Sequence, residues 1–228
     1  FNLIDGVDGL AGSLGLMTAL VFGTYFYYVG QLPYAVLAFV LAGSLLGFLI
    51  FNHSPARIFM GDTGSLLLGL INAILVIRFI STANDPSSIF PISSTPAIGF
   101  AILMVPLFDT IRVFSVRILN RRSPFSPDRN HIHHLLLDKG MSHSMVTYTC
   151  VGLNLLFIAF AFYAREWGPT FVLLTMIAFA SVGTAFLFYA KNRSRVYVDG
   201  KISQNEPAIT SQKILSFRKK NYVAPEDN

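Results

Sequence analysis

Residues 10–30 read LAGSLGLMTALVFGTYFYYVG, and this stretch decides the fold class because none of its 21 side chains is charged. The hydrocarbon core of a bilayer needs roughly 20 mostly apolar residues per helix, so the stretch is long enough to cross it. Five further segments carry no charge: 31–51, 63–77, 86–108, 144–164 and 167–190. The segment 63–77 reaches this length if its helix starts near Phe59, and the first part of 86–108, residues 86–95, is typical of a loop rich in Pro and Ser. The sequence therefore predicts an all-α, polytopic integral membrane protein with about six transmembrane helices.

The composition agrees with this class. Of 228 residues, 53% are hydrophobic and 13% are charged, whereas about 25% are charged in a typical soluble domain. A disordered chain and a collagen-like fibre are excluded, and the single Cys150 excludes an internal disulfide or a Cys-rich zinc site. A soluble helix bundle is the alternative, but a chain of this length cannot cover six helices that are apolar all round.

The composition changes after residue 190. Lys, Arg, Ser, Asn and Glu replace the apolar residues, which is typical of a soluble segment. We therefore divide the chain into a transmembrane core, residues 1–190, and a partly disordered cytoplasmic tail, residues 191–228.

The basic residues predict the orientation. In a six-helix arrangement only Arg78 and Arg165, of 17 Lys and Arg residues, fall on one side of the membrane. The other 15 fall on the opposite side, which the positive-inside rule places in the cytoplasm. Three polar clusters share that cytoplasmic side, and this coincidence points to a site there.

The first cluster is NLIDGVDG, residues 2–9. Asp5 and Asp8 are three residues apart, so they would share one face if the segment were helical. Paired carboxylates at a membrane surface suit a divalent cation or a hydrogen-bonding substrate group. The alternative is an ordinary helix start, where acidic residues are favoured by the helix dipole.

The second cluster is NHSPARIFMGDTGS, residues 52–65, in which Asp62 lies between Gly61 and Gly64 at the start of an apolar helix. Glycines let backbone amides approach a ligand, and a helix N-terminus favours an anion such as phosphate. A carboxylate and an anion share one site when a cation bridges them, so we expect Mg²⁺ between Asp62 and a pyrophosphate. An N-cap role for Asp62 is the alternative.

The third cluster is DRNHIHH, residues 128–134. Three histidines beside arginines favour a loop that binds phosphate and handles protons. A chance surface cluster and a zinc site are the alternatives, although Cys ligands are missing. Nearby, Asp109 and Arg112 are three residues apart on a predicted helix, and they either face the bundle interior or pair at the interface.

These residues resemble a known family. NLIDGVDGLA at 2–11, FMGDTGS at 59–65 and HIHH at 131–134 look like three signatures of the polyprenyl-phosphate N-acetylhexosamine-1-phosphate transferases, glycosyltransferase family 4. The HIHH form is similar to the bacterial undecaprenyl-phosphate N-acetylglucosamine-1-phosphate transferase branch. The resemblance covers about residues 1–190.

The resemblance implies a Mg²⁺-dependent enzyme, with Mn²⁺ as a substitute, in the bacterial inner membrane. It would transfer a sugar 1-phosphate, expected to be N-acetylglucosamine 1-phosphate, from a UDP-sugar to undecaprenyl phosphate and release UMP. Its partners would be these substrates, the membrane and a second copy of the chain, but no nucleic acid. The implied site residues are the catalytic Asp5, Asp8, His131, His133 and His134, the substrate-binding Asn2, Asn52, Phe59 and Arg129, and the metal ligand Asp62.

The chain departs from the family pattern at one point. Family members carry an adjacent Asp-Asp pair in an earlier cytoplasmic loop, and this sequence has none. We therefore expect the chain to be the C-terminal part of a longer protein and to be inactive alone.

Two other classes are the alternatives. A CDP-alcohol phosphatidyltransferase also has an Asp-x-x-Asp-Gly segment, but its pattern continues with further aspartates, whereas the next one here is Asp62. A transporter would carry ionisable residues at mid-membrane depth, whereas here they gather at the cytoplasmic rim.

Overall fold

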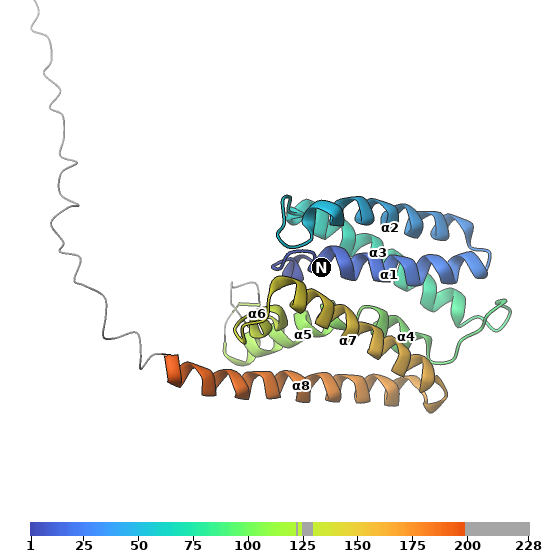
Figure 1. Cartoon of the computed structure of the whole chain (residues 1–228). Helices are drawn as coiled ribbons and strands as arrows, with labels where there is room; N and C mark the ends of the chain where they lie inside the picture. The colour runs from blue at the N-terminus through green and yellow to red at the C-terminus, as the bar shows by residue number, and fades with distance from the viewer. Residues whose placement is uncertain (122, 125–129, 199–228) are drawn as a thin grey trace, which may run out of the picture. The chain divides into compact units, whose positions relative to one another are not determined.

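The computed structural model describes residues 1–121, 123–124 and 130–198 (Figure 1). Residues Phe1–Lys191 form one compact unit, and the chain from Asn192 on forms a second. Of the predicted tail, residues 191–228, the part from 199 on lies outside the described residues.

Every regular element in the described residues is a helix, so the predicted all-α class is confirmed. Five helices are long and apolar enough to cross a membrane, α8 through its part Pro169–Tyr189. They are α1 (Leu10–Tyr28), α2 (Leu32–Asn52), α3 (Gly61–Ala83), α7 (His143–Tyr163) and α8 (Pro169–Val198). A sixth span is supplied if α4 (Thr95–Ile102) and α5 (Met104–Leu119) are taken together. The short helices are η1 (Asn2–Ile4), α6 (Ile132–Leu137) and η2 (Arg165–Trp167). The chain is therefore a multi-pass membrane protein.

Helix α1 is the central helix of this unit. Of its membrane-length stretch 61% is buried, against 17–28% in the other four. Small residues allow the close approach: a Cβ on Gly15 would lie 2.8 Å from Leu68 of α3 and 3.1 Å from Leu45 of α2. Glycine at a helix interface lets two backbones come together in this way.

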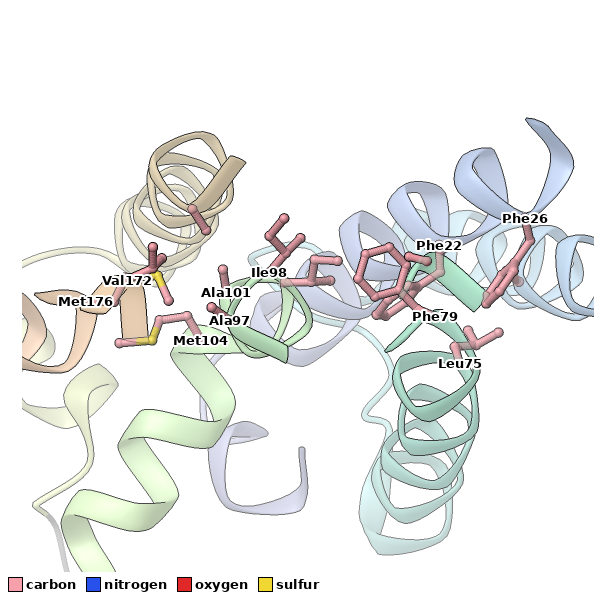
Figure 2. Close-up of a cluster of buried hydrophobic side chains, with 14 of the residues drawn as sticks. Phe22, Phe26, Leu75, Phe79, Ala97, Ile98, Ala101, Met104, Val172 and Met176 are labelled. Carbon is pink, nitrogen blue, oxygen red and sulfur yellow. The ribbon is translucent and has the colours of Figure 1, made fainter. Parts of the chain in front are cut away.

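Aromatic and aliphatic side chains fill the core beside α1. Figure 2 shows Phe22 and Phe26 of α1 with Leu75 and Phe79 of α3, and a second group from α4, α5 and α8. The rings of Phe22 and Phe79 lie 5.8 Å apart between centroids. These contacts hold α1 against its neighbours. Because the polar segment 2–9 continues directly into α1, they also restrain the position of that segment.

The fourth predicted span is broken. The sequence predicts one span within 86–108, after a loop at 86–95; in the structure this span is split, because α4 ends at Ile102 and α5 turns away by 85°. Pro106 has no N–H to donate to the carbonyl of Ile102, four residues earlier, so the helix loses a hydrogen bond there. The side chain of Asn154, on α7, takes over: its Nδ2 donates to Ile102 O (2.9 Å) and Ala101 O (3.2 Å), and its Oδ1 accepts from Val105 N (2.9 Å).

The polar segments gather at one end of the helices. Figure 1 places η1, the α2–α3 connection and α6 at the same end, and the α1–α2, α3–α4 and α7–α8 connections at the other. Arg165 lies in η2 at that second end, and Arg78 donates to Gln31 of the α1–α2 turn (2.9 Å). The three polar clusters therefore meet, as the sequence predicts, and the two isolated basic residues lie away from them.

Candidate functional site

The first and second clusters are joined by Asn52 and Asp8. The Asn52 side chain is buried; its Oδ1 accepts from Gly9 N (3.0 Å) and its Nδ2 donates to Ile58 O (2.8 Å). The Asp8 carboxylate accepts from Ala56 N (3.2 Å). Together the two side chains hold the α2–α3 connection against the segment that precedes α1.

The first cluster also packs on α6 and α7. Asp8 Oδ2 lies 3.2 Å from His143 Nδ1, and the Thr147 hydroxyl donates to Asp8 O (3.0 Å). A Cβ on Gly6 would lie only 2.5 Å from His133 Nε2. Glycine is therefore required at position 6 if the imidazole is to stay where it is.

The two aspartates of the first cluster do not share a helix face. Helix η1 ends at Ile4, a turn follows, and α1 begins only at Leu10, after Gly9 with φ +74°. Residues 5–8 are therefore not helical: they form turns between the end of η1 and the left-handed Gly9 that precedes α1. As a result Asp8 is engaged with Ala56 and His143, whereas Asp5 is acted on by the charge of another carboxylate.

That carboxylate is Asp62. Burial and, after it, the negative charge of Asp62 raise the pKa of Asp5 above its usual range. Asp62 is exposed in the first turn of α3, where Met60 is the N-cap residue, so the N-cap alternative for Asp62 is also wrong. A positive charge near both carboxylates would favour their ionised forms.

The carboxylate pair fits Mg²⁺. Among the residues that the structure describes, no group of three or more His, Cys, Asp or Glu side chains is placed to hold a metal ion. A zinc site needs such a set, whereas Mg²⁺ is usually bound by one or two carboxylates, waters and substrate phosphates. Asp5 and Asp62 carry oxygen atoms of the hard kind that this ion prefers.

Three further residues of the first two clusters are at least partly accessible: Phe59, Asn2 and Gly61. Phe59 is 77% exposed, so its ring is free to stack on a planar group. Asn2 is half-buried in η1. Gly61 has φ +67°, and a Cβ on it would meet nothing within 4 Å, so the backbone at the start of α3 is open to a ligand.

The third cluster is held by Asp109 of α5. Its Oδ2 accepts from His131 Nδ1 (2.8 Å), and its Oδ1 accepts from Ile132 N (3.0 Å) and from Arg112 (2.9 Å). Arg112 also donates to Asn130 O. The Asp109–Arg112 pair therefore faces the interior, where it anchors the histidine loop.

The histidines are stacked and largely buried. The rings of His131 and His133 lie 5.6 Å apart at 9°, and those of His133 and His134 lie 4.3 Å apart. Burial and then the neighbouring His134 lower the pKa of His133 to about 4. His133 is therefore neutral at pH 7, and its buried Nδ1 has no hydrogen-bond partner among the described residues.

Arg129, which the sequence predicts to bind phosphate, lies outside the described residues. Sequence reasoning missed His143 and Thr147, which hold Asp8, and it gave Asn154 little weight. No spacing rule marks these three, because each acts on a segment that is distant in the chain.

Comparisons of the sequence with known proteins all indicate the same family. The model of glycosyl transferase family 4 matches residues 1–80. The chain is 36% identical to a decaprenyl-phosphate N-acetylglucosaminephosphotransferase of Mycobacterium tuberculosis over 206 residues, which covers 80% of this chain and 49% of the relative. It is 40% identical to the enzyme of the same name from Mycobacterium leprae over 173 residues, with 67% and 42% covered.

A third relative comes from Escherichia coli K12. It is an undecaprenyl-phosphate alpha-N-acetylglucosaminyl 1-phosphate transferase, 30% identical over 186 residues, with 79% of this chain and 49% of the relative covered. The chain thus spans about half the length of the curated relatives it matches. No solved structure matches the chain.

Proposed function

The chain belongs to glycosyl transferase family 4, and we propose that the protein transfers N-acetylglucosamine 1-phosphate from its UDP-sugar to a polyprenyl phosphate and releases UMP. The observation that carries this proposal is the convergence of the three clusters: the charge of Asp62 acts on Asp5, and Gly6 lies against His133 of the histidine loop. Such a reaction brings two anions together, the lipid phosphate and the sugar-nucleotide pyrophosphate. A site for it needs cationic and hydrogen-bonding groups around oxygen ligands for a metal.

Asp5 and Asp62 are the proposed holders of Mg²⁺, with Mn²⁺ as a substitute. When bound, the ion would neutralise charge on the pyrophosphate and on the departing UMP. The N-terminus of α3 lies beside Asp62, and its free amides and dipole favour the same anion. These features support binding of the diphosphate between the second cluster and the histidine loop.

The remaining roles follow from exposure and hydrogen bonding. We assign Phe59 to stacking on the uracil ring, because its side chain is exposed beside the carboxylates, and Asn2 to the edge of the same pocket. Asp8 and Asn52 border this pocket as positioning residues, since their polar atoms already bind the backbone.

The histidine loop would handle the phosphates. His131 and His134 with Arg129 are the proposed contacts to phosphate oxygens, and neutral His133 is proposed to act as a hydrogen-bonding group. The family assignment gives no support to the phosphatidyltransferase and transporter alternatives.

The surroundings of the site are also proposals. In the six-span arrangement 15 of the 17 Lys and Arg residues fall on the side of the polar clusters, so we place that side at the cytoplasmic face of the bacterial inner membrane. We also propose, as the family resemblance implies, that the protein pairs with a second copy.

The test measures UMP release by the full natural polypeptide with UDP-N-acetylglucosamine, undecaprenyl phosphate and Mg²⁺. We expect Asp62→Asn to lower kcat by about 100-fold or more and EDTA to abolish turnover, because the metal loses a ligand or is removed. Phe59→Ala should raise KM for the UDP-sugar about tenfold, as expected for one lost base stack.

The matched control is Asp85→Asn, which changes an exposed aspartate in the α3–α4 connection at the opposite end. It should leave both constants unchanged. Near-normal UMP release by a correctly inserted Asp62→Asn protein would refute the metal assignment, and no release by the wild-type protein would refute the reaction.

A further inference from the structure

Asp109 is a buried carboxylate with three hydrogen-bond donors, and all three serve the histidine loop. His131 Nδ1 lies 2.8 Å from Oδ2, and Ile132 N lies 3.0 Å from Oδ1. The third donor, Arg112, is 2.9 Å from Oδ1 and also donates to Asn130 O. One carboxylate on α5 therefore fixes three consecutive residues, 130–132, at the start of α6.

The charge of Asp109 decides which nitrogen of His131 carries a proton. An ionised carboxylate only accepts hydrogen bonds, so the ring nitrogen that faces it must be the donor. His131 Nδ1 therefore holds a proton. No other hydrogen bond of the His131 ring occurs within the described residues, so Nε2 is left without a partner there.

We propose that Asp109 is a positioning residue that acts through His131: it holds the imidazole with its proton on Nδ1 and so keeps Nε2 ready to accept a proton or a hydrogen bond. This inference rests on the proposed function, because His131 is one of the groups assigned to the phosphates. In the site, Nε2 would receive a proton from a phosphate or bind a protonated oxygen. A carboxylate that orients a histidine in this way is a recurring arrangement in catalytic and metal sites.

Asp109→Asn is predicted to reverse the tautomer. Two donors, Arg112 and Ile132 N, converge on Oδ1, so an asparagine would place its carbonyl oxygen there and its NH₂ group toward His131. An NH₂ group only donates, so Nδ1 would have to accept and the ring proton would move to Nε2. Nε2 would then be a donor and no longer an acceptor.

The experiment is a double-mutant cycle on the full natural polypeptide, read as UMP release. Asp109→Asn should lower kcat by about 10–100-fold, the usual effect of removing such an orienting partner, with KM for the UDP-sugar nearly unchanged. In the His131→Gln background the same substitution should cost less than about twofold, because no imidazole remains for Asp109 to orient. If the two losses multiply instead, Asp109 does not act through His131 and the inference is overturned.

A second measurement needs no Asp109 variant to fold. ¹⁵N NMR of histidine-labelled wild-type protein at pH 9, with His131 assigned by comparison with His131→Gln, reports which ring nitrogen is protonated. A proton on Nδ1 alone supports the inference, and any proton on Nε2 overturns it. The two proposals fail separately: an inactive wild-type protein counts against the reaction, whereas an active one with the wrong tautomer counts against the role of Asp109.

Discussion

Replacing Asn154 by leucine should destabilise the protein because three backbone groups lose a hydrogen-bond partner, and not because packing is lost. Asn154 is 0% exposed, and its amide group bonds Val105 N, Ala101 O and Ile102 O at the break between α4 and α5. Leucine branches at the same position but has no polar atom. The variant therefore fills the space and removes every hydrogen bond at once.

The magnitude follows from the number of groups left unpaired. A buried polar group that loses its partner costs about 1–3 kcal/mol. Val105 N can move back toward Ala101 O, its ordinary helical partner, but Ile102 O cannot recover because Pro106 has no N–H. One group therefore stays unpaired, and we expect a loss of about 1–3 kcal/mol, which corresponds to a fall in Tm of about 2–12 °C for a protein of this size.

Asn72→Leu is the matched control. Asn72 is also buried, 1% exposed, in the middle of α3, but its Nδ2 donates only to Leu68 O in its own helix and its Oδ1 has no partner. Leucine there removes an unpaired atom and leaves the helical hydrogen bonds intact. We expect its Tm to stay within about 4 °C of the wild type, or to rise.

Thermal denaturation in detergent, followed by size-exclusion chromatography and by UMP release, compares the two variants. Turnover of folded Asn154→Leu protein should also fall, because α5 carries Asp109 and a change in the 85° bend moves it away from His131. Equal shifts in Tm for the two variants would refute the reasoning. They would show that stability depends on the loss of a buried amide as such, and not on whether that amide binds backbone groups of another helix.

Two further predictions concern the contact between the first cluster and α6. Gly6→Ala should reduce turnover at least about tenfold at unchanged yield, because its Cβ would displace His133. Gly152→Ala in α7, where a Cβ would meet nothing within 4 Å, is the control. Equal turnover of the two variants would contradict this prediction. His133, whose pKa is lowered to about 4, stays neutral in the folded state but is protonated below about pH 6.5 when unfolded, so acid favours unfolding. The Tm of the wild type should therefore fall more than that of His133→Gln between pH 7.5 and pH 5, and parallel curves would exclude the effect.

The membrane spans were readable from the sequence because hydrophobic length is a local property. The uncharged stretch 10–30 became α1, Leu10–Tyr28, and 144–164 became α7, His143–Tyr163. Convergence of the polar clusters followed from the same reasoning, since successive spans return alternate loops to the same end of the bundle. Neither inference needed any knowledge of tertiary contacts.

The break at Leu103 was not readable in the same way. Pro106 alone signals a lost hydrogen bond, but many transmembrane helices contain proline and only kink. Here the partner that satisfies the freed groups is Asn154, 49 residues beyond Val105. The spacing of Asp5 and Asp8 misled for a related reason, because the left-handed turn at Gly9 lies beyond the pair and ends any helical periodicity.

Polar side chains buried in an apolar chain must find partners, and in this protein their partners lie far away in the sequence. Asn52 binds Gly9 across 43 residues, Asp109 binds Ile132 across 23, and Asn154 binds Val105 across 49. Apolar contacts alone leave the rotation of a helix about its axis, and its position along that axis, weakly determined. Each of these hydrogen bonds forms only in one relative position of the two segments that it joins. Each also holds a segment that carries a proposed site residue or leads to one. Substitution of these three residues should therefore disturb the geometry of the site before it disturbs insertion of the helices into the membrane.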